Sequence, residues 1–317
     1  FVDGVCERSP ELISTERGFG DWLNGDRVQL EGYPETGGAP PIKPFATAYF
    51  AHSAETLAKM ARVLGRDDDE KKYTELAASI RRAFQERFVS PDGVVEGDTQ
   101  GGYALSLHYG MLPAAQRPAA VDNLVESIRA YDDRLSTGII TTHRMLLELS
   151  RGGRNDLAYQ LFESRRCPSW GFMIENGATT IWERWDSCVP DRDSLWRRQA
   201  SILQLPQTPG FQTNSMNSFN HQEFASVGEW IYRVILGIEP DESQPGYKHF
   251  FIRPRPGGSL TYARGSLHTV RGPIAVDWSR TGDLLTLQVT MPPNTTATVA
   301  LPADELNGVT ESGKPLA

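Results

Sequence analysis

The chain has 317 residues, about twice the length of an average domain, so it forms one large domain or two ordinary ones. Hydrophobic residues make up 39% and charged residues 23%, as in soluble globular proteins, and no run of about 18 apolar residues predicts a membrane span. Forty acidic and 32 basic residues give a net charge of −8, which argues against a protein that binds a nucleic-acid backbone.

Residues 1–239 are predicted to form a helical domain. A 3.6-residue apolar period predicts a helix from Pro44 to Leu64, and a second helix from a capping box at Asp67 and Glu70 to a turn at 91–93. Two long helices joined by so short a link pack as an antiparallel hairpin. Further helices are expected at 102–112, 121–128, 142–149, 155–162 and 221–236. Repeated hairpins without intervening strands indicate an α/α toroid or an irregular bundle.

The sequence period changes after residue 246, where a β-sandwich is predicted over 247–317. Leu285, Leu287 and Val289 alternate with polar residues, which is the two-residue repeat of a half-buried strand. Other strands are expected at 249–253, 260–268, 274–278 and 296–301. The proline-rich stretch 239–246 is expected to be the hinge between the two domains.

The cysteines and histidines do not predict a metal site. Cys6, Cys167 and Cys188 are odd in number and lack a CxxC spacing, so neither a disulfide framework nor a zinc site is favoured. The histidines show no ligand spacing, and we expect no metal and no cofactor. A reducing, cytoplasmic location fits this cysteine usage. A secreted or periplasmic location stays open because the sequence begins at Phe1, and the N-terminus of the protein is expected to be absent from it.

Three segments place carboxylates or a histidine among aromatic residues: 18–22, 170–186 and 217–221. Aromatic rings pack against the apolar face of a sugar, and carboxylates bind its hydroxyls or act as acid and base, so this pattern is typical of a carbohydrate site. The candidate residues are Asp21, Trp22, Trp170, Trp182, Glu183, Trp185, Asn220 and His221.

Each polar candidate also has a purely structural interpretation. Asp21 can cap a helix or a turn, and His221 can cap the helix that is expected to begin there. Glu183 can be the ion-pair partner of Arg184 or of another basic residue.

The block Gly-Ala-Thr-Thr-Ile-Trp-Glu-Arg-Trp-Asp at 177–186 resembles the signature of the α-L-rhamnosidases of glycoside hydrolase family 78. Further motifs follow in the order of that family at 18–22, 97–100, 135–138, 168–171, 218–221 and 246–249. The resemblance covers essentially the whole chain. It implies a mainly α protein, with an (α/α)6-barrel-type helical domain followed by a C-terminal β-sandwich.

The resemblance also implies roles for the candidate residues. Glu183 becomes the general base of an inverting mechanism, Asp21 binds sugar hydroxyls, and His221 contacts the sugar or the attacking water. The implied substrate-contacting residues are Trp22, Trp170, Trp182, Trp185 and Asn220.

One departure from the family concerns the general acid. The family carries it in an Asp-Glu-Arg-x-x-Trp-x-Gly-Asp stretch that this sequence lacks. Glu16 and Arg17 match only the Glu-Arg part of that motif. Trp196 and the two arginines after it have no assigned place. We therefore expect the C-terminal part of a catalytic region, with the barrel incomplete and little hydrolysis by this chain alone.

The expected function is hydrolysis of terminal α-L-rhamnosyl residues from glycosides or polysaccharides. The expected partner is a rhamnose-containing carbohydrate, with neither nucleic acid nor membrane, and a homo-oligomer is possible. Two alternatives stay open: another α/α-toroid carbohydrate enzyme, and a non-catalytic or truncated sugar-binding homologue without the general acid.

Overall fold

A computed structural model describes residues 2–14, 18, 20–28, 33–34, 38–187, 217–302 and 308–315. The chain divides into two compact units, residues 1–226 and 227–317, which are described separately. Glu16, Cys188 and Trp196 lie outside the described residues. Among the described residues, no helix is both long and apolar enough to cross a bilayer.

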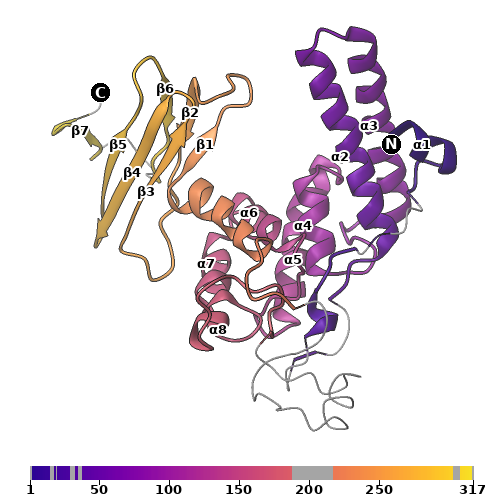
Figure 1. Ribbon diagram of the computed structural model, residues 1–317, viewed down its shortest axis with the longest axis horizontal. Coiled ribbons are helices and arrows are strands. Elements are labelled where there is room, and N and C mark those ends of the chain that lie inside the picture. Colours follow the sequence, from indigo (N-terminus) through magenta and orange to yellow (C-terminus); the bar gives the residue numbers. More distant parts are fainter. Residues whose placement is uncertain are drawn as a thin grey trace. The chain divides into compact units, whose positions relative to one another are not determined.

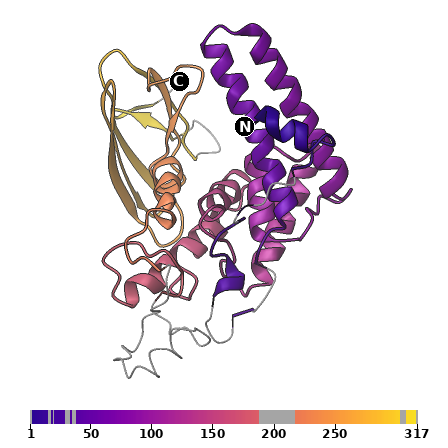
Figure 2. The same cartoon turned by 45° about the vertical axis from the view of Figure 1, so that its right-hand side comes forward.

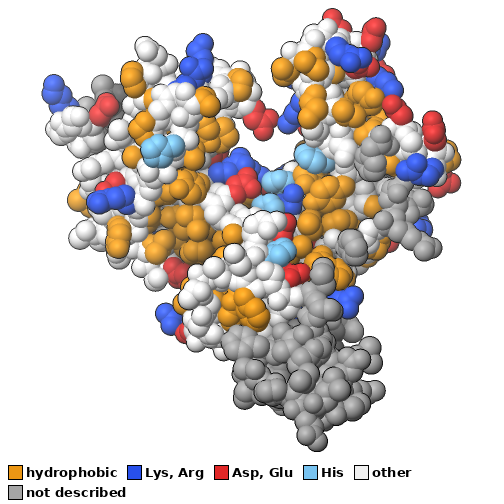
Figure 3. All heavy atoms as spheres, in the orientation of Figure 1, with side chains coloured by type: hydrophobic (Ala, Val, Ile, Leu, Met, Phe, Trp, Pro, Cys, Tyr) orange, Lys and Arg blue, Asp and Glu red, His pale blue; other side chains and the backbone are white. Residues whose placement is uncertain are grey.

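The first unit is built from helices, and its longest elements form the predicted hairpin. Helices α2 (Ile42–Val63) and α3 (Asp67–Phe88) lie side by side in both views (Figures 1 and 2). The buried face of α2 is largely alanine, and that of α3 carries Ile80 and Phe84 one turn apart. Acidic and basic side chains alternate at the tip of this hairpin (Figure 3), where Arg66 pairs with Asp69. The predicted hairpin is therefore confirmed.

The predicted capping box at the start of α3 is wrong. Arg66 occupies the N-cap position without a side-chain hydrogen bond, and Asp67 is already the first helical residue. Glu70 does not reach back to the cap, because its carboxylate accepts a hydrogen bond from Arg62 Nε at 2.7 Å. Four acidic residues in the first turn instead stabilise the helix start by their charge against the helix dipole.

The remaining helices of this unit follow the predicted order with shifted ends. They are α4 (Gln100–His108), α5 (Arg117–Arg129), α6 (Thr142–Arg151) and α7 (Asn155–Glu163). Two short helices, α1 (Val2–Arg8) and α8 (Trp170–Glu175), were not expected from the sequence. They are only two turns long or less, so their apolar residues cannot establish a 3.6-residue period.

The regular helix predicted over 221–236 is also wrong. The chain instead forms a 3-10 turn, η3 (Phe224–Ser226), a short α10 (Val227–Trp230) and a π-helical turn, η4 (Ile231–Ile235). The reason lies at its predicted start: the backbone N–H of His221 donates to the carbonyl of Ile181 at 2.8 Å. This tertiary hydrogen bond holds residue 221 in a loop.

A buried carboxylate joins α4, α5 and α6 of the first unit. Glu148 on α6 is 2% exposed and contacts His108 at 3.1 Å, Arg151 at 2.5 Å and Arg117 at 3.5 Å. Burial tends to raise the pKa of this carboxyl, but the hydrogen bond from His108 and the charge of Arg151 outweigh it and lower the pKa.

We expect Glu148 to make the stability of the fold depend on pH. Because its pKa in the folded chain lies below its ordinary value of 4.5, its stabilisation is complete above that pH and is lost as the pH falls through the folded pKa. Urea unfolding at pH 7 and at about pH 4 measures the difference, and Glu148→Gln should reduce it. The exposed Glu126, paired with Arg129, supplies the control Glu126→Gln. Equal pH dependence of both variants would contradict the expectation.

The second unit is a β domain. Strands β3 (Tyr262–Thr269), β4 (Gly272–Thr281) and β5 (Leu284–Thr290) form one antiparallel sheet. In the other, β2 (His249–Ile252) pairs with β1 (Ile238–Pro240) and, in parallel, with β6 (Thr296–Val299). A short hairpin of β7 (Thr310–Glu311) and β8 (Lys314–Pro315) follows. The predicted order of a helical domain before a β domain is confirmed.

The core of the β domain forms because side chains alternate along its strands. Ile274, Val276 and Trp278 on β4 are fully buried, as is Phe250 on β2. The indole N–H of Trp278 donates to the carbonyl of Ile235 at 2.7 Å, so the core extends to the π-helical turn of the same unit. The alternate residues of β4, Ala275, Asp277 and Ser279, face the opposite side of the sheet.

Candidate active site

The loop around Asp21 is anchored by its carboxylate. Asp21 is 1% exposed, and both of its oxygens accept hydrogen bonds from the segment that leads into α6. The donors are Gly138 N (2.7 Å), Ile140 N (3.1 Å), Thr141 N (3.1 Å) and Thr141 Oγ1 (2.5 Å). A carboxylate offers about four acceptor positions, so protein donors use all of them.

The electrostatics of Asp21 follow from these contacts. Burial raises the pKa of its carboxyl, while the Thr141 hydroxyl and the three backbone N–H groups oppose the rise because they bind the charged form. The carboxylate also lies before the N-terminus of α6, where the helix dipole favours a negative charge.

Gly138 makes the close approach of the two loops possible. A Cβ at this position would lie 2.3 Å from the Trp22 carbonyl oxygen and 2.7 Å from that of Asp21, so any other residue would collide with backbone. The Ile139 N–H donates to the same Trp22 carbonyl at 2.9 Å. The glycine at 138 is thus the sequence signal that a second chain segment passes at this point.

A further contact extends from this turn to the 177–186 block. The indole N–H of Trp185 donates to the Thr137 carbonyl at 3.0 Å, and Arg184 donates to the Arg27 carbonyl at 3.1 Å. The loops that carry Asp21, Thr137 and Trp185 are therefore connected by successive hydrogen bonds, although they are far apart in sequence.

Glu183 is held against the 217–221 segment. Its backbone N–H donates to the Ser218 carbonyl at 2.8 Å, and the Ser218 N–H donates to its Oε2 at 2.7 Å. The Thr180 hydroxyl donates to the Phe219 carbonyl, next to the bond between His221 and Ile181. The two segments thus run together, and Glu183 is 5% exposed.

The ion pair considered for Glu183 is not formed with its neighbour. The guanidinium of Arg184 points to Asp186, at 3.4 Å, and to the Arg27 carbonyl. Within the described part of the chain, the Glu183 carboxylate accepts its hydrogen bond from the Ser218 N–H, at Oε2. One carboxylate oxygen is thus fixed, and Oε1 is left for a further donor.

Three of the four candidate tryptophans belong to the protein interior. Trp170, Trp182 and Trp185 are 6%, 3% and 1% exposed. Trp185 packs on Phe224 with ring centroids 3.8 Å apart and meets Trp170 edge to face at 5.3 Å. Trp182 meets the Phe219 ring edge to face at 5.6 Å. These rings hold the two segments together.

The fourth tryptophan and the 220–221 pair are more accessible. Trp22 is half-buried, with the Arg27 guanidinium 5.9 Å from its ring. Asn220 is exposed, and His221 is half-buried, with a weak 3.5 Å contact from the Glu223 N–H to its Nδ1. That contact favours the tautomer in which Nε2 carries the proton.

Sequence reasoning missed several residues that build this region. Ser218 supplies the backbone N–H for Glu183, Thr141 supplies two donors for Asp21, and Phe224 packs on Trp185. Of these three residues, only Ser218 belongs to a motif that the sequence analysis singled out, the one at 218–221. In the described ranges, no three His, Cys, Asp or Glu side chains lie close enough together to hold a metal ion.

Comparison with known protein families identifies two matching regions. Residues 1–235 match the bacterial alpha-L-rhamnosidase 6 hairpin glycosidase domain, and residues 237–315 match the bacterial alpha-L-rhamnosidase C-terminal domain.

Individual relatives are similar over nearly the whole chain. An alpha-L-rhamnosidase of Streptomyces avermitilis is 44% identical over 298 residues, covering 94% of this chain and 26% of the relative. One of Formosa agariphila is 36% identical over 300 residues, covering 93% of this chain and 30% of the relative. The chain thus spans less than a third of the length of either relative.

Solved structures are similar over the same extent. The crystal structure of Streptomyces avermitilis alpha-L-rhamnosidase complexed with L-rhamnose matches with a TM-score of 0.82 and 42% identity, covering 96% of this chain and 27% of that one. The alpha-L-rhamnosidase from Dictyoglumus thermophilum matches with a TM-score of 0.78 and 30% identity, covering 94% of this chain and 30% of that one.

Proposed function

Because the chain belongs to the bacterial alpha-L-rhamnosidase 6-hairpin glycosidase family, we propose that it carries the general base and part of the sugar site of an α-L-rhamnosidase. The substrate would be a glycoside or polysaccharide with a terminal α-L-rhamnosyl residue. The observation that supports the proposal most is the attachment of Glu183 to the 217–221 segment, with one carboxylate oxygen fixed by Ser218 N–H.

In the proposed reaction Glu183 takes a proton from water through Oε1. The water then attacks the anomeric carbon from the face opposite the leaving group, and the configuration inverts. A backbone N–H on Oε2 keeps the carboxylate oriented without neutralising it, which suits a base. The general acid, which protonates the leaving group, would lie about 6.5–9.5 Å from Glu183 and is not assigned to a residue of this chain.

The surrounding residues take supporting roles. We propose that His221 donates from Nε2 to the sugar or to the attacking water, with Asn220 beside it. Trp22 is the proposed aromatic platform, because it is the half-buried one of the four tryptophans. Trp170, Trp182 and Trp185 are proposed to shape the site from behind.

For Asp21 we propose a positioning role. Its acceptor positions are used by Gly138, Ile140 and Thr141, so a sugar hydroxyl would have to displace one of these donors. By fixing this turn, Asp21 fixes the Thr137 carbonyl that holds the Trp185 indole, two residues beyond Glu183.

Binding of L-rhamnose tests the proposed function without requiring hydrolysis. In two-dimensional ¹H–¹⁵N NMR of the chain, we expect L-rhamnose to shift the amide signals of 181–187 and 217–223. Its mirror image, D-rhamnose, should shift neither segment. Equal shifts with both sugars, or none with either, would contradict the proposal. Where hydrolysis of an aryl α-L-rhamnoside is measurable, the first-formed anomer should be β.

A further inference from the structure

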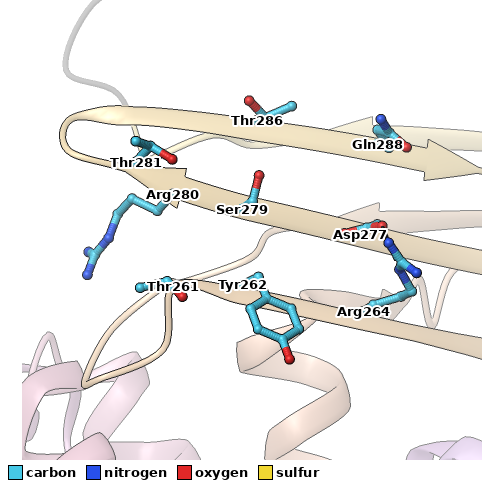
Figure 4. A pocket seen from close by; sticks show the side chains of 9 residues that line it. All are labelled: Thr261, Tyr262, Arg264, Asp277, Ser279, Arg280, Thr281, Thr286 and Gln288. Carbon is cyan, nitrogen blue, oxygen red and sulfur yellow. Dashed lines mark hydrogen bonds and ion pairs between the residues drawn. The ribbon is translucent and has the colours of Figure 1, made fainter.

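The β domain carries a polar hollow that the proposed function leaves unused. It has a volume of about 650 Å³ and lies on one face of the β3–β4–β5 sheet (Figure 4). Strand pairing builds it from two rows of side chains across the sheet. The first row is Tyr262, Ser279 and Thr286, and the second is Arg264, Asp277 and Gln288.

The two faces of this sheet differ in character. Ile274, Val276 and Trp278 of β4 are buried in the core of the domain. Asp277 and Ser279 of the same strand face the hollow, where Arg264 pairs with Asp277 at 2.6 Å (Figure 4). Ligand-binding hollows have volumes of about 300–1,000 Å³, and this one lies within that range.

An exposed aromatic ring lies at the edge of the hollow. Tyr262 is 68% exposed, although it belongs to a regular strand. Within the described residues, its hydroxyl makes no hydrogen bond to protein, and neither do the side chains of Ser279, Thr286 and Gln288. An accessible ring beside hydroxyl and amide groups matches a sugar, which has an apolar C–H face and a rim of hydroxyls.

The charge of the hollow adds a preference among sugars. Arg280 is the last residue but one of β4 and lies at the rim of the hollow, with its side chain directed away from Ser279 (Figure 4). Within the described ranges its guanidinium has no acidic partner. With Arg264 it sets two guanidinium groups against the one carboxylate of Asp277. A guanidinium binds a carboxylate through two parallel hydrogen bonds, so the free one favours an acidic sugar unit.

We propose that this hollow is a second, non-catalytic binding site for a saccharide chain that carries carboxylate groups. Tyr262 stacks on a sugar ring, the polar rows bind hydroxyls, and Arg280 binds a carboxylate. The choice of a saccharide rests on the proposed function, since a glycosidase that acts on a polymer gains from holding the polymer away from the bond it cleaves. Binding here raises the local concentration of chain ends at the catalytic site.

Isothermal titration of the full chain with two matched sugars tests the proposal. The probes are an α-1,4-linked tetramer of galacturonic acid and the same tetramer as its methyl ester, in calcium-free buffer. We expect the acid to bind at least tenfold more tightly than the ester. Arg280→Gln should abolish that preference, and Tyr262→Ala should weaken binding of the acid at least tenfold.

Two controls separate this site from misfolding and from the rhamnose site. Val270 is 90% exposed and lies in the β3–β4 turn, at the opposite end of the sheet from the hollow. Val270→Ala should leave the affinities for both tetramers unchanged. Tyr262→Ala should keep the L-rhamnose shifts at 181–187. If the wild-type chain shows no L-rhamnose shifts but still binds the acidic tetramer, the proposed function is refuted and the second site is not. No binding of the acid, equal affinity for acid and ester, or full affinity in Tyr262→Ala would overturn the second site.

Discussion

Replacement of Glu183 by glutamine is expected to lower kcat for rhamnoside hydrolysis by about 10²-fold or more, because general-base assistance is lost. Glutamine keeps the shape of the side chain, and its amide oxygen can still accept the Ser218 N–H. What disappears is the basic oxygen that takes the proton from water. KM should change far less, since the lost interaction belongs to the transition state. The measurement is steady-state kinetics on an aryl α-L-rhamnoside, with a protein that contains this chain together with the segment that supplies the general acid.

Glu175 provides the matched control for this substitution. It lies in the same region of the chain, is about half exposed and pairs with Arg165 at 2.8 Å. Glu175→Gln should leave kcat unchanged. Azide should not restore the rate of Glu183→Gln with retained configuration, because inversion involves no covalent sugar–enzyme intermediate. If Glu183 is only structural, Glu183→Gln will melt at a lower temperature while each folded molecule turns over normally, and that result would move the base to Glu175 or Asp186.

Replacement of Asp21 by asparagine is expected to destabilise the helical unit by about 3–5 kcal/mol. The NH₂ group of asparagine donates hydrogen bonds and cannot accept them, so two of the donors that now bind the carboxylate would be left buried without an acceptor. The donors at stake are the backbone N–H groups of Gly138, Ile140 and Thr141 and the Thr141 hydroxyl. Urea unfolding measures the change. The indole N–H signal of Trp185 should also move, since its acceptor is the Thr137 carbonyl in the same turn.

The same substitution at Asp26 tests whether burial is decisive. Asp26 lies five residues after Asp21, in the 3-10 turn η1 (Gly25–Arg27). It accepts hydrogen bonds from Gly38 N–H at 2.7 Å and Ala39 N–H at 3.3 Å, but it is exposed. Water can replace the lost acceptor there, so Asp26→Asn should cost only about 1 kcal/mol. If Asp21→Asn and Asp26→Asn lower the free energy of unfolding equally, the positioning role of Asp21 is contradicted. Loss of L-rhamnose binding in a fully stable Asp21→Asn would favour direct contact with sugar.

Features that depend on neighbouring residues were predictable from the amino-acid sequence. Apolar residues three and four apart produce one buried helix face, so the hairpin of α2 and α3 followed from its period. Apolar and polar residues alternate along 284–290, and this two-residue period predicted strand β5. The 177–186 block was recognisable because its residues are contiguous, and it identified the family without knowledge of the fold.

The accessibility of the candidate side chains and their contacts depend on how distant segments fold together. The donors that use the Asp21 carboxylate lie 117 to 120 positions further along the chain. His221 begins no helix because its N–H binds the carbonyl of Ile181, and a local pattern carries no record of such a partner. Tryptophans suit a sugar platform and a protein core equally well, so only packing against Phe219 and Phe224 separated Trp182 and Trp185 from the half-buried Trp22. Burial and distant hydrogen bonds arise when segments far apart in sequence meet, and composition and period do not encode that meeting residue by residue.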